Sequence, residues 1–315
     1  MVVGAAVAFI ALAMAPVALT TGSQAGPSAA VRVWTIHYRA HDGQIRRAFV
    51  ELPSWYGPGW NPPIPLVISP HGRGIPADDT IRRWGDLPAI GNFAVVHPEG
   101  QGRHLTLFAW GDPGDISDLA KMPTFVQRAL PWLRINPRRI YAVGASMGGQ
   151  ETLLLVARHP HLLAGAAAFD APTDMAARYR AFSLLRDGRH LQKLARIEFG
   201  GTPATHPRAY EIRSPLAWAR QIAFSGVPLQ IWWSPSDRVV VDQAQESGLL
   251  YRDILRLNPE APVRQFVGIW AHTMEMRAGT RLPIALGLFH LVPQSAAHYG
   301  GGYYPRLPRG LKPLG

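Results

Sequence analysis

A glycine-flanked serine near the middle of the chain constrains the fold more than any other stretch. The apolar run 140–143 leads into Gly144-Ala145-Ser146-Met147-Gly148-Gly149, and an apolar helical pattern follows over 153–157. In a strand–turn–helix context, the G-x-S-x-G spacing holds a serine hydroxyl clear of the sheet on a strained turn. Side chains two residues to either side would collide with the strand or the helix, so both positions require glycine. The pattern predicts a nucleophilic serine, although a plain strand-to-helix turn can share it.

A serine nucleophile needs a base, because the pKa of a free hydroxyl is far too high for attack at neutral pH. His272 comes just after the short apolar run 263–267, whereas His290 and His298 lie in or after the last expected helix. We therefore interpret His272 as the base. The alternative is a histidine of a surface loop with no catalytic part.

The base needs a carboxylate that fixes its tautomer and stabilises the imidazolium. Asp237 follows the strand-like run 229–233, and Asp170, a rival acid, follows the run 163–169. The carboxyl ends of parallel strands meet at one edge of a sheet, so we expect Asp237 to lie near Ser146 and His272. The alternative is that Asp237 only stabilises a turn.

Two backbone N–H groups are predicted to stabilise an oxyanion. The first belongs to Met147, at the start of the helix behind the serine. The second lies in the stretch Pro70-His71-Gly72-Arg73-Gly74, which follows a short apolar strand. We expect the Arg73 amide to supply it, with Gly72 as the alternative, and we interpret His71 as a structural, hydrogen-bonded histidine.

Trp110 and Trp270 flank the expected cleft and are candidate substrate-binding residues, either of which could instead pack in the core. The histidines show no metal-ligand grouping, so neither a metal nor another cofactor is expected.

The pattern of apolar runs predicts an α/β fold: a mostly parallel eight-stranded sheet with helices on both faces. The hydrolase domain is expected over 31–290, with an antiparallel hairpin at the sheet edge and a small helical, lid-like insertion over 173–218. Helices are expected over 115–133 and 242–257, among others, and the tail 291–315 is expected to be irregular. The eight expected strands are 31–39, 45–52, 66–69, 94–96, 140–143, 163–169, 229–233 and 263–267.

The first 25 residues predict export from the cell. Residues 2–19 are apolar and uncharged, and Ser23-Gln24-Ala25 fits a small-x-small cleavage pattern, so this is a signal peptide or an N-terminal membrane anchor. We therefore expect a secreted or envelope-associated bacterial protein. The absence of cysteine excludes disulfides and a thiol nucleophile. The net charge of +11 comes from scattered arginines without a nucleic-acid-binding motif, so no nucleic-acid partner is expected. The oligomeric state is left open.

At these residues the chain resembles the α/β-hydrolase superfamily. It is most similar to prolyl-oligopeptidase-type catalytic domains and to secreted polyhydroxybutyrate-depolymerase-like and feruloyl-esterase-like esterases. The resemblance extends over about 31–289. It rests on the serine turn, on Ser214-Pro215, on Ser236-Asp237-Arg238-Val239-Val240 and on Trp270-Ala271-His272. It implies Ser146 as nucleophile, Asp237 as acid, His272 as base and Met147 as an oxyanion donor.

The expected activity is hydrolysis of carboxylic esters, small or polymeric, through an acyl-enzyme. The alternatives are a peptidase of the oligopeptidase type without its β-propeller, an acyltransferase, and a binding protein on an inactive hydrolase scaffold. Because oligopeptidases of this type use a propeller to filter peptides, and the printed sequence has none, we expect esters rather than peptides.

Overall fold

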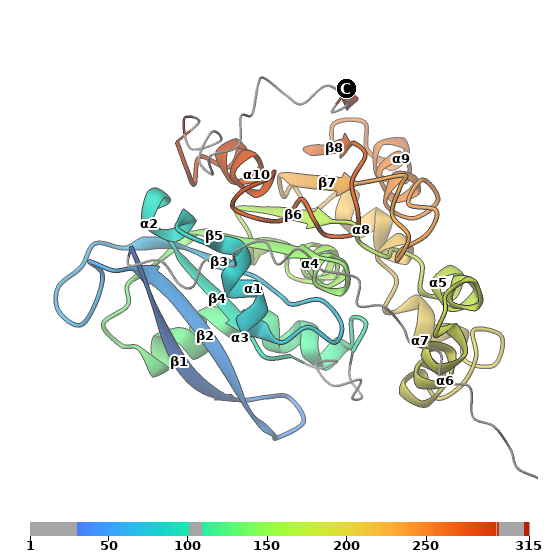
Figure 1. Ribbon diagram of the computed structural model, residues 1–315, viewed down its shortest axis with the longest axis horizontal. Helices are drawn as coiled ribbons and strands as arrows, with labels where there is room; N and C mark the ends of the chain where they lie inside the picture. The colour runs from blue at the N-terminus through green and yellow to red at the C-terminus, as the bar shows by residue number, and fades with distance from the viewer. Residues whose placement is uncertain (1–29, 101–108, 294, 296–311, 315) are drawn as a thin grey trace, which may run out of the picture.

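The computed structural model describes residues 30–100, 109–293, 295 and 312–314 (Figure 1). The expected signal peptide or anchor over 1–25 and most of the tail over 291–315 lie outside this part of the chain. No helix within it has the length and apolar character that crossing a bilayer requires.

A single sheet with the strand order β1-β2-β4-β3-β5-β6-β7-β8-β9 organises the described residues. The pairs from β4 through β3 and β5 to β8 are parallel, whereas β1 with β2, β2 with β4 and β8 with β9 are antiparallel. The strands are β1 Val31–Arg39, β2 Ile45–Pro53, β3 Ile64–Ile68, β4 Ala94–Pro98, β5 Ile135–Ala145, β6 Gly165–Phe169, β7 Leu229–Trp233, β8 Val263–Val267 and β9 Lys312–Leu314.

The α/β class, the mostly parallel sheet and all eight expected strands are confirmed. The correction is the ninth strand: Lys312–Leu314 pairs antiparallel with β8, so this piece of the tail is not irregular. Its backbone takes the edge of β8 that β7 leaves unpaired, which satisfies N–H and C=O groups that an edge strand exposes.

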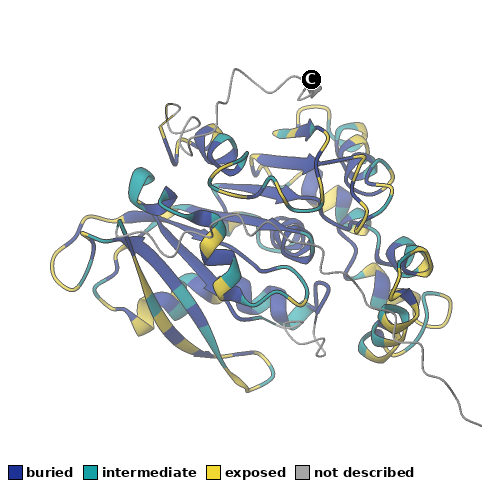
Figure 2. Cartoon of the chain, in the orientation of Figure 1, coloured by how far each residue is buried: buried dark blue, intermediate teal, exposed yellow. Residues whose placement is uncertain are grey.

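Alternate residues of the central strands enter two separate cores, because successive side chains of a strand point to opposite faces. In β3, Leu66 and Ile68 belong to one core and Val67 to the other. The first core is covered by α3 Pro113–Ala129, α4 Met147–Arg158, α8 Ala219–Ala223 and α9 Ser247–Leu257. The second is covered by α1 Ala77–Trp84, α2 Leu87–Gly91 and α10 Leu282–Leu288. Figure 2 shows the central strands between these layers, β3 to β7, as almost wholly buried.

Two helices begin at other residues than expected. The helix predicted from Asp242 begins only at Ser247: the Asp242 carbonyl accepts the N–H groups of Gln245 and Glu246, but Glu246 has a ψ of −101°, which interrupts this turn before α9. The helix predicted over 115–133 runs from Pro113 to Ala129, and the side chain of Asp112 caps it by accepting the N–H of Gly114.

The insertion over 173–218 is helical, with α5 Met175–Ala181, α6 Gly188–Phe199 and α7 Pro207–Glu211 (Figure 1). Short 3-10 turns complete it at Phe182–Leu184 and Pro215–Trp218, and a further one lies at Pro160–Leu162 after α4. Its apolar side chains form a third core together with Trp110 and Met147. The insertion therefore packs directly on the turn that carries Ser146.

A buried carboxylate fixes the start of this insertion. Glu246 accepts the N–H of Asp174 at 2.8 Å and both the N–H and the hydroxyl of Thr173. Burial raises the pKa of Glu246 to about 7, against these hydrogen bonds, which lower it.

Candidate active site

The serine turn has the strained geometry that its sequence predicts. Ser146 lies between β5 and α4 with φ 58° and ψ −126°, a region that residues other than glycine rarely adopt. A Cβ atom on Gly144 would lie 2.3 Å from the carbonyl oxygen of Gly148, and one on Gly148 would lie 2.2 Å from that of Pro70. Both glycines are therefore required by backbone contacts, as expected.

The packing around Gly148 leads to a stability prediction. Gly148→Ala should lower the free energy of unfolding by about 3 kcal/mol, because the new methyl group meets backbone that cannot move aside. Urea unfolding monitored by circular dichroism measures the change. Gly287→Ala is the matched control, since a Cβ atom there meets nothing within 4 Å inside α10, and it should be neutral or slightly stabilising. Equal stability of the two variants would contradict this account of the turn.

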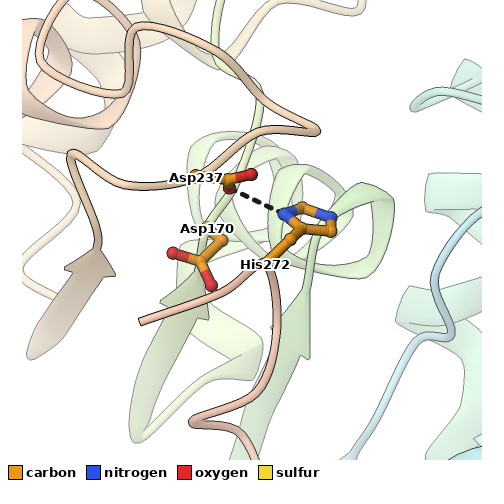
Figure 3. Close-up of side chains that lie close together, drawn as sticks. All are labelled: Asp170, Asp237 and His272. Carbon is orange, nitrogen blue, oxygen red and sulfur yellow. Dashed lines mark hydrogen bonds and ion pairs between the residues drawn. The ribbon is translucent and has the colours of Figure 1, made fainter. Parts of the chain in front are cut away.

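His272 and Asp237 lie together at the carboxyl edge of the sheet, after β8 and β7 (Figure 3). Nδ1 of His272 lies 2.7 Å from Oδ2 of Asp237. An ionised carboxylate only accepts hydrogen bonds, so Nδ1 carries the proton and Nε2 is the basic atom of the neutral ring. His272 and Ser146 line the same pocket.

The carboxylate of Asp237 is held by its own loop. Oδ1 accepts the N–H groups of Val239 at 2.8 Å and of Val240 at 3.0 Å, and Oδ2 accepts a hydrogen bond from the Gln243 amide at 3.4 Å. The sequence after the aspartate thus serves to position it: the chain turns back so that two amides fix one oxygen while the other faces His272.

Asp170, the rival acid, is placed beneath this pair. Its two oxygens each lie 3.0 Å from Nε1 of Trp270, and Oδ2 also accepts the N–H of Thr273 at 2.8 Å. Asp170 therefore holds the loop on either side of His272, while Asp237 takes the hydrogen bond of the imidazole. Burial raises the pKa of Asp170 to about 7, and His272 opposes this shift.

This raised pKa makes stability depend on pH. The folded protein keeps a proton on Asp170 that the unfolded chain, with the ordinary pKa of 3.8, has released, so this stabilisation is full below about pH 4 and is lost as the pH rises through 7. In Asp170→Asn, the decrease in the free energy of unfolding between pH 5 and pH 8 should be smaller than in the wild type. Urea titrations at both pH values measure it. Asp253→Asn, on the surface of α9, is the control, and an identical decrease in all three proteins would refute the assignment.

Only one group of histidine and carboxylate side chains in the described residues is compact enough for a metal ion, namely Asp170, Asp237 and His272. Their atoms are already engaged with one another or with N–H donors: the imidazole with Asp237, and Asp170 with Trp270 and Thr273. The hydrogen bond from Nδ1 of His272 to Asp237 is the one that a triad requires, and it leaves Nε2 as the basic atom.

The predicted oxyanion donors lie at the same pocket. Met147 is the first residue of α4, where N–H groups have no acceptor within the helix. Arg73 and Gly72 follow β3 and also line the pocket. His71 is structural: Nε2 accepts the N–H of Gly100 at 3.1 Å, so Nδ1 carries the proton and donates to the Gly72 carbonyl at 2.8 Å.

The pocket has a volume of about 280 Å³, and the two tryptophans relate to it differently. Trp110 lines it, but the Arg73 guanidinium lies over one face of the indole, 3.5 Å from the ring centroid. Trp270 is 6% exposed, belongs to the second core and is absent from the lining. The structure thus places Trp270 in the core, the alternative that the sequence left open, where its buried N–H finds an acceptor in Asp170.

Some residues of the site carry no recognisable signal in the sequence. Arg178 of α5 lines the pocket and donates to the Val239 carbonyl beside Asp237, and Glu198 of α6 pairs with Arg73 at 3.5 Å. Both belong to the insertion, whose helices follow no motif. Only their charge inside an otherwise amphipathic helix could have pointed to them.

Comparisons with known proteins agree with this architecture. No family model matches the chain. Over 110 residues it is 31% identical to poly(3-hydroxyalkanoate) depolymerase C of Paucimonas lemoignei, a match that covers 33% of this chain and 27% of that protein. The similarity thus spans only about a quarter of that relative's length.

Solved structures match over most of the chain at low identity. An acylaminoacyl peptidase of Pyrococcus horikoshii aligns with a TM-score of 0.62 and 16% identity over 82% of this chain and 41% of its own. A fungal esterase of Rhizomucor miehei aligns with a TM-score of 0.61 and 16% identity over 84% and 83%. Prolyl oligopeptidase B of Galerina marginata aligns with a TM-score of 0.60 and 14% identity over 85% and 37%. In agreement with its sequence motifs, the chain has the α/β-hydrolase fold that these esterases and peptidases share.

Proposed function

We propose that this protein is a serine hydrolase that cleaves carboxylic esters through an acyl-enzyme. The observation that carries the proposal is the hydrogen bond of 2.7 Å between His272 and Asp237, at a pocket that Ser146 also lines. The strained backbone at Ser146 supports it, because such strain persists at functional sites when the surrounding packing maintains it.

In the first half of the reaction, the Ser146 oxygen attacks the ester carbonyl while Nε2 of His272 takes the hydroxyl proton. The negative charge that moves to the carbonyl oxygen is stabilised by the amides of Met147 and Arg73. Asp237 stabilises the imidazolium. Collapse of the tetrahedral intermediate breaks the bond to the alcohol, which leaves with the proton from Nε2.

The second half repeats these steps with water. Nε2 of His272 takes a proton from the water, whose oxygen attacks the acyl carbon. The new intermediate expels the Ser146 oxygen, which regains its proton from Nε2, and the carboxylic acid departs. Every group thereby returns to its starting protonation state.

A substrate panel tests the reaction class. The protein, produced from about Gly26 onward, is assayed with nitrophenyl esters of several chain lengths and with blocked peptide anilides. The kcat/KM values for the two classes of substrate are then compared. We expect the esters to be cleaved and the anilides to be cleaved far more slowly or not at all. Faster cleavage of the anilides would make the protein a peptidase, and transfer to an added alcohol in preference to water would make it an acyltransferase.

The similarity to a depolymerase supports a polyester as substrate, and the apolar N-terminal segment within 1–25 supports export from the cell. An external polymer cannot enter a cell, so an enzyme that acts on one must be secreted or face outward. Release of soluble hydroxy acids from a polyester film by the purified protein is the expected result for this extension.

A further inference from the structure

The permanently charged side chains that line the pocket are of one sign. Among the described residues that line it, the permanently charged ones are Arg73, Arg83 and Arg178, and none is a carboxylate. In a partly enclosed site, such a set produces a positive potential that concentrates anions. Arg178 is engaged with the Val239 carbonyl near Asp237, which leaves the other two arginines to be explained.

Arg73 is buried with unsatisfied hydrogen-bonding capacity. Its side chain is 10% exposed, and Nε, Nη1 and Nη2 have no hydrogen-bond partner among the residues that the structure describes. Glu198 approaches only to 3.5 Å, and burial raises the pKa of that carboxyl to about 7, so it balances the guanidinium incompletely. Buried donors of this kind are normally satisfied, and a guanidinium is shaped to donate two parallel hydrogen bonds to one carboxylate.

Arg83 is a second arginine of the pocket lining. It lies on α1, one turn after Thr80, which also lines the pocket, and no ion pair joins its side chain to a carboxylate of the described chain. Burial lowers the pKa of Arg83, and the nearby Arg277 lowers it further. Arg83 and Arg277 repel each other, and neither has an ion-pair partner among the described residues, so a bound anion would relieve this repulsion.

We propose that Arg73 and Arg83 form a carboxylate-binding subsite beside Ser146, so that the preferred substrates are esters whose acyl or alcohol part ends in a carboxylate. This rests on the proposed function, and it narrows the substrate class to anionic esters. The anion would lie between the loop after β3 and α1, where it would supply the acceptors that Arg73 lacks.

Two matched substrate pairs test the subsite. For the acyl side, the 4-nitrophenyl monoester of adipic acid is compared with 4-nitrophenyl hexanoate. For the alcohol side, the hexanoate ester of 4-hydroxybenzoate is compared with that of 4-hydroxybenzamide. The anionic member of at least one pair should have a kcat/KM about 10-fold higher or more, the effect of a charge-assisted hydrogen bond. The preference should shrink as salt is added.

Two variants separate the subsite from the general positive charge. Arg83→Gln should reduce the preference about 10-fold. Arg82→Gln is the control, because it removes the same charge one residue away. The Arg82 side chain pairs with Asp79 and does not line the pocket, so this variant should leave the preference for the anionic ester unchanged. An equal reduction in both variants would assign the preference to net charge and overturn the subsite.

Failure of the subsite and failure of the proposed function give different results. If the neutral esters are cleaved as fast as the anionic ones in both pairs, and Ser146→Ala abolishes both activities, the subsite is wrong and the hydrolase stands. If no ester is cleaved, titration calorimetry that compares the binding of monomethyl adipate and dimethyl adipate tests the subsite independently of catalysis. Binding of the monoanion alone, lost in Arg83→Gln, supports it, and equal or absent binding of the two overturns it.

Discussion

Replacement of Ser146 by alanine should lower kcat for a nitrophenyl ester by about 10⁶, by analogy with other triads in which the nucleophile is removed. The loss is this large because the acyl-enzyme can no longer form, and the remaining oxyanion donors can assist only direct attack by water. The fold should be unaffected, since Ser146 holds its place through its backbone N–H, which donates to Phe169 at 2.9 Å. Steady-state kinetics with the purified variant measure the effect.

A second serine provides the control for this experiment. Ser183 lies exposed in the insertion, and Ser183→Ala removes a hydroxyl whose hydrogen bond within the described residues goes to the local carbonyl of Arg180. Its kcat should equal that of the wild type. If Ser146→Ala cleaved the ester at the wild-type rate, the nucleophile would have to be another group and the proposed mechanism would be abandoned.

Asp237→Asn should lower kcat by about 10⁴, the second-largest effect we expect. An amide in place of the carboxylate can donate to Nδ1, which favours the wrong tautomer and leaves the imidazolium without its counter-charge. The backbone amides of Val239 and Val240 would still find an oxygen, so the loop should keep its conformation. Kinetics across pH 6 to 9 measure the change.

Asp242→Asn and Asp170→Asn are the comparisons that identify the acid. Asp242 is exposed with a φ of 58°, which asparagine tolerates, so its variant should retain full activity. Asp170→Asn should lose much less than Asp237→Asn, because Asp170 contacts Trp270 and Thr273 rather than the imidazole. If the loss of 10⁴ fell on Asp170 instead, the two carboxylates would have to exchange roles.

The sequence predicts those parts of the site that depend on backbone geometry. The turn at Ser146 is readable because only glycine fits at 144 and 148, and the strands are readable because a buried parallel sheet needs uninterrupted apolar runs. Asp237 and His272 can then be assigned because each follows a parallel strand, and parallel strands end at the same edge of the sheet.

Features that depend on side chains from distant segments could not be predicted. The sequence offers Trp270 as a candidate for stacking, but its burial depends on Asp170, 100 residues earlier, accepting the indole N–H. The start of α9 at Ser247 follows a non-helical residue, Glu246, whose carboxylate binds Thr173 and Asp174, 73 and 72 residues earlier. The arginines around the pocket are likewise indistinguishable, in the printed sequence, from the many arginines on the surface.

The most direct test of the central claim, an activated nucleophile at Ser146, is covalent labelling with a fluorophosphonate followed by intact-mass measurement and peptide mapping. We predict one adduct per chain, on Ser146, which disappears in Ser146→Ala and is greatly slowed in His272→Ala because the hydroxyl then has no base. An unlabelled wild-type protein, or an adduct on any other residue, would contradict the claim.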